Sequence, residues 1–208
     1  MQRHERVRWI WNSADNDELA RRYDEWASSY DVDLDAGFGW IGPRTAAAAF
    51  RRWVPLDARV LDAGAGTGLV GQALAAHGYA ELVAADLSLG MLDQARKKGI
   101  YKEFHQAVLG EVLAFDGAAF DAVISVGVLT QGHAPPSSLN ELVRITRAGG
   151  HIVFSLRTDV YADGGFKERQ AALETEGRWT RVERSAPYRP LPKGEPEVSH
   201  RVWVYRVN

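Results

Sequence analysis

Between residues 57 and 157 the chain alternates short apolar runs with segments whose apolar residues recur every three or four positions. A short apolar run is typical of a buried strand, and the three-to-four spacing is typical of a helix packed on one face. We therefore predict strands at 58–63, 80–86, 101–107, 120–128 and 151–157, and helices at 68–78, 89–99 and 137–150.

Two more strands are expected near the C-terminus, at 179–185 and 199–207, after a helix around 166–174. Strands that alternate with helices form a parallel sheet, whereas two strands joined without a helix run antiparallel. The predicted fold is therefore α/β. It is a Rossmann-like seven-stranded sheet, with six parallel strands, an antiparallel last strand and helices on both faces.

The first 56 residues carry a helical pattern of their own. Leu19, Tyr23 and Trp26 share one face of a helix predicted over 16–31, and Pro43 can open a second helix that reaches residue 54. We expect residues 1–208 to form a single domain. In it, residues 1–56 are an N-terminal helical lid segment and residues 57–208 are the Rossmann-like core.

Several residues suit the ends of the predicted helices. Thr67 offers a cap to the first core helix, and Ser88 offers one to the second, which Gly99 can end. Ser138 and Glu141 have the spacing of a capping box at the start of the third.

Composition and charge exclude several classes of chemistry and of binding partner. The chain has no cysteine, which excludes disulfides and thiolate catalysis, and its six histidines show no metal-ligand spacing. The formal net charge is -2, with no basic stripe for nucleic acid. The N-terminus does not read as a signal peptide, and no apolar stretch approaches the ~20 residues of a membrane span. We expect a cytoplasmic protein, monomer or homodimer, that binds no metal, nucleic acid or membrane.

The stretch VLDAGAGTGLV, residues 60–70, places an acid and three alternating glycines after the first core strand. Ligands of open α/β sheets bind beyond the carboxyl ends of the strands, and glycines let the backbone approach them closely. A dinucleotide site has the pattern Gly-x-Gly-x-x-Gly, but Leu69 occupies its third glycine position and Asp62 would repel a pyrophosphate. S-adenosylmethionine carries an ammonium and a sulfonium group, so a carboxylate at this place suits it, directly or through water.

A second acid, Asp86, ends the second core strand. An acid at this place can bind both hydroxyls of a ribose, and dinucleotide enzymes use it too, so Asp86 alone does not choose between the cofactors. Leu87 and Met91 follow it and can form apolar walls beside an adenine ring.

The stretches VLDAGAGTG, AADLSLGMLDQA and FDAVISVGVL together resemble the class I S-adenosylmethionine-dependent methyltransferases, over roughly residues 19–157. The segments YDEWASSYDVDL, GTGLVGQALAAHGY, GMLDQARKKGIY and VGVLTQGHAP look most like the Williams–Beuren-region methyltransferase-like proteins. The resemblance implies a transferase that uses S-adenosyl-L-methionine and releases S-adenosyl-L-homocysteine.

The resemblance also implies a cofactor site built from the glycine turn, two strand ends and the N-terminal segment. The methionine part would lie against Asp62, Gly64, Ala65, Gly66 and Val126, the ribose against Asp86, and the adenine beside Leu87 and Met91. Tyr23 and Tyr30 would close over the cofactor, although aromatic residues on a helix face also occur as core residues.

One position departs from the broader family pattern. Many relatives carry an acid that accepts a hydrogen bond from the adenine amino group, and in this chain Leu109 stands there. We expect the backbone around Gly110 or the carboxylate of Glu111 to substitute.

The reaction implied is in-line methyl transfer. Because the sulfonium is a good leaving group, proximity and orientation can supply much of the rate, with few or no obligatory acid–base groups. His133, in the loop after the fourth core strand, is the candidate general base, or else an exposed loop residue.

The charge balance and the small C-terminal addition favour a small-molecule acceptor. We expect it near loops 129–136, 157–165 and 186–197, with Trp40, Arg157, Tyr188, Arg189 and Leu191 as candidate contacts. Two alternatives stay open. A non-catalytic S-adenosylmethionine-binding sensor or partner subunit would show no methyl transfer, and a nucleotide-dependent oxidoreductase would bind NAD.

Overall fold

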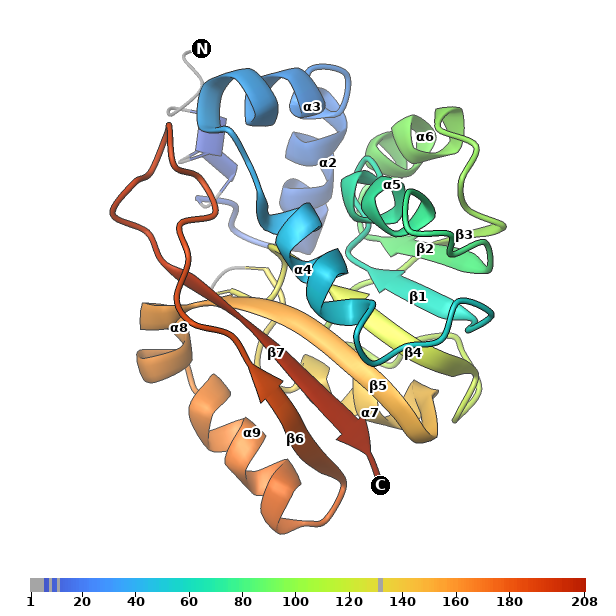
Figure 1. Cartoon of the computed structure of the whole chain (residues 1–208). Coiled ribbons are helices and arrows are strands. Elements are labelled where there is room, and N and C mark those ends of the chain that lie inside the picture. The colour runs from blue at the N-terminus through green and yellow to red at the C-terminus, as the bar shows by residue number, and fades with distance from the viewer. Residues whose placement is uncertain (1–5, 8, 11, 131–132) are drawn as a thin grey trace.

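The computed structural model describes residues 6–7, 9–10, 12–130 and 133–208. Its centre is a seven-stranded sheet with the strand order β3-β2-β1-β4-β5-β7-β6 (Figure 1). β7 pairs antiparallel with β5 and β6, and the other pairings are parallel, which confirms six parallel strands and an antiparallel last strand. The strands are β1 Val60–Ala63, β2 Leu82–Asp86, β3 Glu103–Gln106, β4 Phe120–Ser125, β5 Thr146–Arg157, β6 Trp179–Arg184 and β7 His200–Val207.

Helices cover both faces of this sheet, as predicted. One face packs against α4 (Gly42–Phe50), α5 (Leu69–Ala75) and α6 (Leu89–Lys97). The opposite face packs against α7 (Ser138–Ile145) and α9 (Phe166–Thr175).

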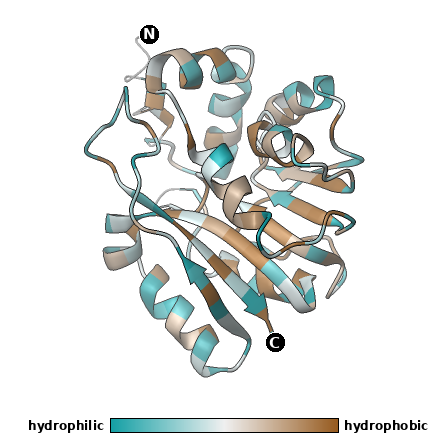
Figure 2. Cartoon of the chain, in the orientation of Figure 1, coloured by the Kyte–Doolittle hydropathy of each residue, from teal (hydrophilic) through white to brown (hydrophobic). Residues whose placement is uncertain are grey.

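The central strands are buried on both faces, which explains why most of their residues are apolar. In β1, Val60 belongs to the core on the first face and Leu61 to the core on the second, and both are fully buried. Figure 2 shows the same character as brown colour along the central strands. The sheet is therefore a rigid support for the loops at its carboxyl edge.

The N-terminal segment lies across the end of the sheet toward which the parallel strands point (Figure 1). It contains α2 (Asn16–Trp26), the short helix α3 (Tyr30–Val32) and a π-helix, η1 (Asp33–Phe38). The helix predicted over 16–31 is therefore interrupted after Trp26. The carboxylate of Asp33 accepts hydrogen bonds from Trp26 Nε1 (2.8 Å) and Ser29 Oγ (3.1 Å), which hold the chain in a bend there.

Two acids of this segment fasten it to the core. Asp24 Oδ1 accepts from Ser88 Oγ (2.5 Å) and from the backbone N–H of Gly90 (2.7 Å), at the start of α6. Ser88 also caps α6, as predicted, by accepting from the N–H of Met91.

The second fastening is at Asp31. Its carboxylate accepts from Thr67 Oγ1 (2.5 Å) and pairs with Lys98 Nζ (2.7 Å). Thr67 was expected to cap α5, and that prediction is wrong. Gly68 occupies the N-cap without a side-chain bond, because the Thr67 hydroxyl is engaged by the N-terminal segment.

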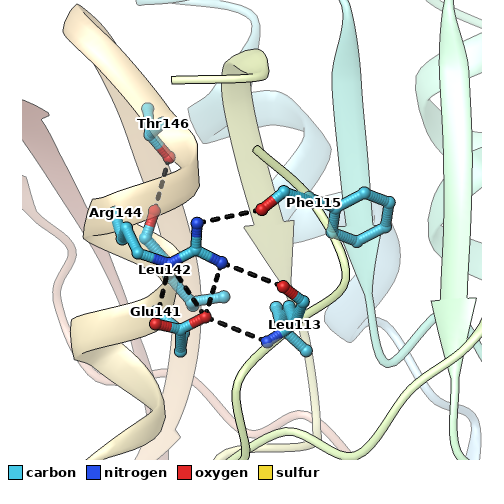
Figure 3. A network of polar contacts seen from close by, with 6 residues as sticks. All are labelled: Leu113, Phe115, Glu141, Leu142, Arg144 and Thr146. Carbon is cyan, nitrogen blue, oxygen red and sulfur yellow. Dashed lines mark hydrogen bonds and ion pairs between the residues drawn. The ribbon is translucent and has the colours of Figure 1, made fainter. Parts of the chain in front are cut away.

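The predicted capping box of α7 is also wrong. The Glu141 carboxylate accepts from the backbone N–H of Leu113 (2.9 Å) and pairs with Arg144 (2.7 Å) (Figure 3). Arg144 in turn donates to the carbonyls of Leu113 and Phe115. The acid therefore anchors the segment before β4, and Ser138 Oγ accepts and donates no hydrogen bond among the described residues.

Three further boundaries differ from the prediction. α4 ends at Phe50, four residues early, and α7 ends at Ile145, where the chain passes directly into β5. Thr146, expected inside the helix, pairs with Phe120 of β4, and its hydroxyl donates to the carbonyl of Leu142. The predicted loop 157–165 contains the short helix α8, Thr158–Asp163.

Candidate active site

The glycine turn after β1 needs glycine for two different reasons. Gly64, Gly66 and Gly68 all have positive φ angles (+78°, +54° and +92°), which residues other than glycine rarely adopt. At Gly64 a Cβ would lie 2.3 Å from a methyl of Val128, whereas at Gly66 it would meet no atom within 4 Å. The backbone of Gly66 is therefore open toward the space above the turn.

Asp86 joins this turn to the end of β2. Its Oδ2 accepts from the N–H of Gly66 (2.7 Å), and its Oδ1 accepts from the N–H of Ser88 (2.9 Å). Burial raises the pKa of the Asp86 carboxyl, and the backbone hydrogen bonds from Ser88 and Gly66 oppose that rise. Each carboxylate oxygen keeps lone-pair capacity for a further donor, so Asp86 can still accept from ligand hydroxyls.

A cleft opens directly above these residues, between the carboxyl edge of the sheet and the N-terminal segment. Of the residues expected in the cofactor site or in catalysis, the structure gathers on its wall Tyr23, Tyr30, Gly64, Ala65, Gly66, Asp86, Leu87, Met91, Leu109, Val126 and His133. Among the described residues that line it there is no Arg or Lys. A pyrophosphate would find no countercharge here, whereas a cationic ligand suits the Asp86 carboxylate.

Sequence reasoning missed Ala107 and Val108, which also line the cleft. They directly follow β3, and ligands of open α/β sheets bind beyond the carboxyl ends of the strands, at β3 as well as at β1, β2 and β4. Their apolar character gave no signal beyond that position.

Asp62 lies behind the turn and does not line the cleft. Its side chain is fully buried, and its Oδ2 accepts from Tyr101 Oη (2.5 Å). A Cβ on Gly71 would lie 2.2 Å from that hydroxyl, so a glycine there lets the Tyr101 ring slide under the turn. Burial raises the pKa of Asp62 to about 7, and Oδ1 has no hydrogen-bond partner among the described residues. Its role toward the cofactor stays a prediction, and the geometry favours mediated over direct contact.

Gly110 and Glu111, the expected substitutes in adenine recognition, are not on the cleft wall. Both are exposed, and a Cβ on Gly110 would lie 2.8 Å from Pro135 Cδ. The loop packs against the segment after β4, which turns the Glu111 side chain out to solvent. Of the three residues expected at the adenine, Leu109 alone lines the cleft.

Three rings meet where the N-terminal segment faces the loop after β4. Tyr23 Oη and His133 Nε2 are 2.9 Å apart, and the Tyr30 ring lies edge-on to Tyr23 with centroids 6.4 Å apart. Burial, with the Asp86 charge adding to it, raises the pKa of both tyrosines, which keeps their hydroxyls neutral. Gln131 and Gly132 of the same loop lie outside the described residues.

A second cavity adjoins the cleft and shares five residues with it, Tyr23, Tyr30, Trp40, Gly127 and His133. Of the candidate acceptor contacts, Trp40, Arg157 and Leu191 line this cavity, and Tyr188 and Arg189 do not. The connection between β6 and β7 therefore reaches the site through Leu191, together with Glu195 and Val198.

In the described part of the chain, no group of three or more His, Asp or Glu side chains is arranged to hold a metal ion. The described helices are too short or too polar to cross a bilayer.

Comparison with known proteins identifies the family. The model of the methyltransferase domain matches residues 61–154. Human methyltransferase-like protein 27 is 35% identical over 182 residues, which are 84% of this chain and 73% of that protein. The chain therefore belongs to the class I S-adenosylmethionine-dependent methyltransferases. Its cofactor is S-adenosyl-L-methionine, with S-adenosyl-L-homocysteine as the product.

Other similarities are more partial. A demethylmenaquinone methyltransferase of Renibacterium salmoninarum is 35% identical over 149 residues, which cover 66% of this chain and 57% of that enzyme. The solved structure of the [4+2]-cyclase SpnF superposes with a TM-score of 0.70 at 13% identity, covering 94% of this chain and 97% of that one. At that identity the likeness shows the fold alone, and the site has to decide the substrate.

Proposed function

We propose that this methyltransferase acts on a small-molecule acceptor, which it holds beside the cofactor and beneath the N-terminal segment. The observation that carries the proposal is the pair of adjoining cavities, which meet at Tyr23 and His133. Concave sites of this kind, mostly apolar with a few polar groups, are typical of small-molecule binding. The demethylmenaquinone methyltransferase among the relatives is likewise named for a small molecule.

The first cavity is the cofactor site in this proposal. When bound there, S-adenosylmethionine supplies the methyl group for transfer to the acceptor. Asp86 accepts from the ribose hydroxyls, while Leu87 and Met91 contact the adenine. The turn at Gly64–Gly66 and Val126, directly after β4, enclose the methionine part, and Tyr23 and Tyr30 close the cleft from above.

His133 is placed to serve the acceptor. It lines both cavities, and its Nε2 lies against the Tyr23 hydroxyl. We assign it the role of receiving a proton from acceptors that lose one during transfer. Orientation between the two cavities supplies the rest of the rate, so His133→Gln should slow turnover and weaken cofactor binding less than Asp86→Ala does.

The test is calorimetric binding of S-adenosylmethionine, S-adenosylhomocysteine and NAD to the unmodified protein, Asp86→Ala and Glu111→Ala. Removing hydrogen bonds to a carboxylate costs ~1.5–3 kcal/mol, so Asp86→Ala should weaken binding of both sulfur compounds about tenfold or more. Glu111→Ala is the control, because this acid lies outside the cleft and should leave the affinity unchanged.

The unmodified protein should not bind NAD. A screen of small molecules for methyl transfer then identifies the acceptor. Failure of the unmodified protein to bind either sulfur compound, or methylation of nucleic acid in preference to every small molecule tested, would refute the proposal.

A further inference from the structure

The wall of the second cavity comes from several separate parts of the chain and is mainly apolar. α2 contributes Trp26, η1 contributes Leu34, and the β6–β7 connection contributes Leu191 and Val198. The Trp40 ring completes the wall and lies so close to Gly127 that a Cβ there would approach it to 3.0 Å. Indole and aliphatic surfaces of this kind suit a flat apolar body.

The roof over this cavity is held in place by backbone contacts. The N–H of Ile41 donates to the carbonyl of Pro190 (2.9 Å), and the N–H of Lys193 donates to the carbonyl of Phe38 (3.2 Å). A Cβ on Gly194 would lie 2.1 Å from the Phe38 ring, so the two segments pack in direct contact. The N-terminal segment and the β6–β7 connection thus form one roof, which brings their apolar residues to defined positions.

The charges at this cavity are already compensated. Among the described residues that line it, the charged side chains are those of Arg157 and Glu195. The Arg157 guanidinium donates to both oxygens of Asp159, at 3.1 and 2.7 Å, and holds the pKa of that carboxyl down at about 2. The Asp159 carboxylate, and to a smaller extent the Glu195 charge, raise the pKa of the Arg157 guanidinium, so the two charged residues of the wall offset one another. An anionic acceptor would compete with these carboxylates for Arg157, and a cationic one would compete with Arg157 for them.

His200, the first residue of β7, adds no charge to the wall. Burial, aided by the Arg157 charge, lowers the pKa of its imidazole to about 4, so the ring is neutral at physiological pH. Ser155 also faces the cavity, where its Oγ accepts from the N–H of Gly127 (3.0 Å). Polar groups at this end are thus neutral or already bonded.

The remaining polar edge lies where the two cavities meet. Tyr23 Oη and His133 Nε2 form their hydrogen bond there, in reach of both spaces. A hydroxyl or imidazole at such an edge can exchange its partner for a ligand hydroxyl without leaving a buried charge unpaired.

We infer that the second cavity binds the methyl acceptor and selects an uncharged molecule with a flat apolar body and a hydroxyl group that meets Tyr23 and His133. The inference rests on the proposed function, because the first cavity must hold the cofactor for the second to hold the acceptor.

Three matched probes test the selection for charge. Naphthol, naphthoate and naphthylmethylammonium, substituted at the same ring carbon, are titrated near neutral pH into protein saturated with S-adenosylhomocysteine, and binding is measured by calorimetry. We expect naphthol to bind and the two ions to bind about tenfold or more weakly, because a charge loses hydration there without gaining a free partner.

Two variants locate the binding. Leu191→Trp fills the second cavity, so it should weaken naphthol binding about tenfold and keep the affinity for S-adenosylhomocysteine, which also shows that it folds. Leu109→Trp is the matched variant on the wall of the first cavity. It should weaken the binding of S-adenosylhomocysteine and leave the binding of naphthol to the cofactor-free protein unchanged.

Absence of naphthol binding, equal or tighter binding of either ion, or naphthol binding that Leu191→Trp leaves unaltered would overturn the inference. Failure of S-adenosylhomocysteine to bind the unmodified protein would refute the proposed function itself. The two failures are therefore distinguished within one set of titrations.

Discussion

The carboxylate of Asp62 gives the sharpest test of how this site is built, through the substitution Asp62→Asn. Asp62 is fully buried behind the glycine turn, with one oxygen bonded to Tyr101 and the other without a partner among the described residues. Ionising a carboxyl in such a place is unfavourable, and burial accordingly raises its pKa from 3.8 to about 7. Asparagine has a similar shape and carries no ionisable proton.

The sign of the effect follows from proton binding. Between pH 3.8 and about 7 the folded protein holds a proton on Asp62 that the unfolded chain has lost, so this residue makes stability fall as pH rises. The shift of 7 − 3.8, about 3 units, corresponds to roughly 4 kcal/mol over the whole window, and roughly 3 kcal/mol of it is lost between pH 5 and 8. Above about pH 8, where Asp62 is ionised in both states, the loss is nearly complete.

The assay is urea unfolding of the unmodified protein and Asp62→Asn at pH 5 and pH 8. All other titrating groups are common to both proteins, so the change in their difference isolates Asp62. We expect the variant to gain roughly 3 kcal/mol relative to the unmodified protein between the two pH values. A difference that is the same at both pH values within about 0.5 kcal/mol would refute the reasoning.

Tyr101→Phe is the companion variant. In the unmodified protein the Tyr101 hydroxyl donates to Asp62, and this hydrogen bond lowers the pKa of the carboxyl. Without it the pKa of Asp62 should rise further, and the loss of stability should extend to higher pH. If Asp62 serves the cofactor as predicted, Asp62→Asn should also weaken S-adenosylmethionine binding at pH 8 while it stabilises the fold. Calorimetry on the same samples measures this.

Three further predictions address the glycine turn, the N-terminal segment and His200 in the second cavity. Gly64→Ala should destabilise the protein by ~1–3 kcal/mol in urea unfolding, since φ is +78° and Val128 occupies the place of the Cβ. Gly66→Ala should cost less stability and mainly weaken cofactor binding. Asp24→Asn should loosen the N-terminal segment and speed its limited proteolysis, and S-adenosylhomocysteine should slow that cleavage; equal rates in both proteins would contradict the role of Asp24. His200 has its pKa lowered from 6.5 to about 4, so it makes stability fall as pH drops through that window, and His200→Gln should remove roughly 3 kcal/mol of that acid sensitivity, measured by urea unfolding at pH 7 and pH 4.

The apolar pattern determined the core of this fold because each central strand is buried on both faces. A strand such as β1 or β4 is therefore mostly apolar, with Asp62 and Asp121 as the acidic exceptions, and such a run is recognisable in the sequence. The turn after β1 was equally plain, since three alternating glycines mark backbone with positive φ at Gly64, Gly66 and Gly68. The acid at the end of β2 and its relation to the turn followed from strand direction alone.

The sequence could not decide which partner each polar side chain would take. Thr67 and Glu141 had the local spacing of helix caps. In the folded chain, however, Thr67 donates to the carboxylate of Asp31, and Glu141 pairs with the guanidinium of Arg144. Hydrogen bonds to a charged partner outcompete a neutral cap. The same limit applies to Asp62, whose neighbour Tyr101 is 39 residues away.

The second cavity was decided by the tertiary structure. It is formed where α2, η1, the end of β5 and the β6–β7 connection meet, and each of these contributes at most three of the described residues. Trp40, Arg157 and Leu191 were visible as candidates in the sequence, but their approach to Tyr23 and His133 depends on backbone contacts between residues about 150 apart, such as Ile41 and Pro190. The sequence by itself thus determined the α/β fold and the place of the glycine turn, because those rest on local and periodic patterns, and its motifs carried the resemblance to the methyltransferases. Which acceptor fits beside it depends on long-range packing, which only the folded chain defines.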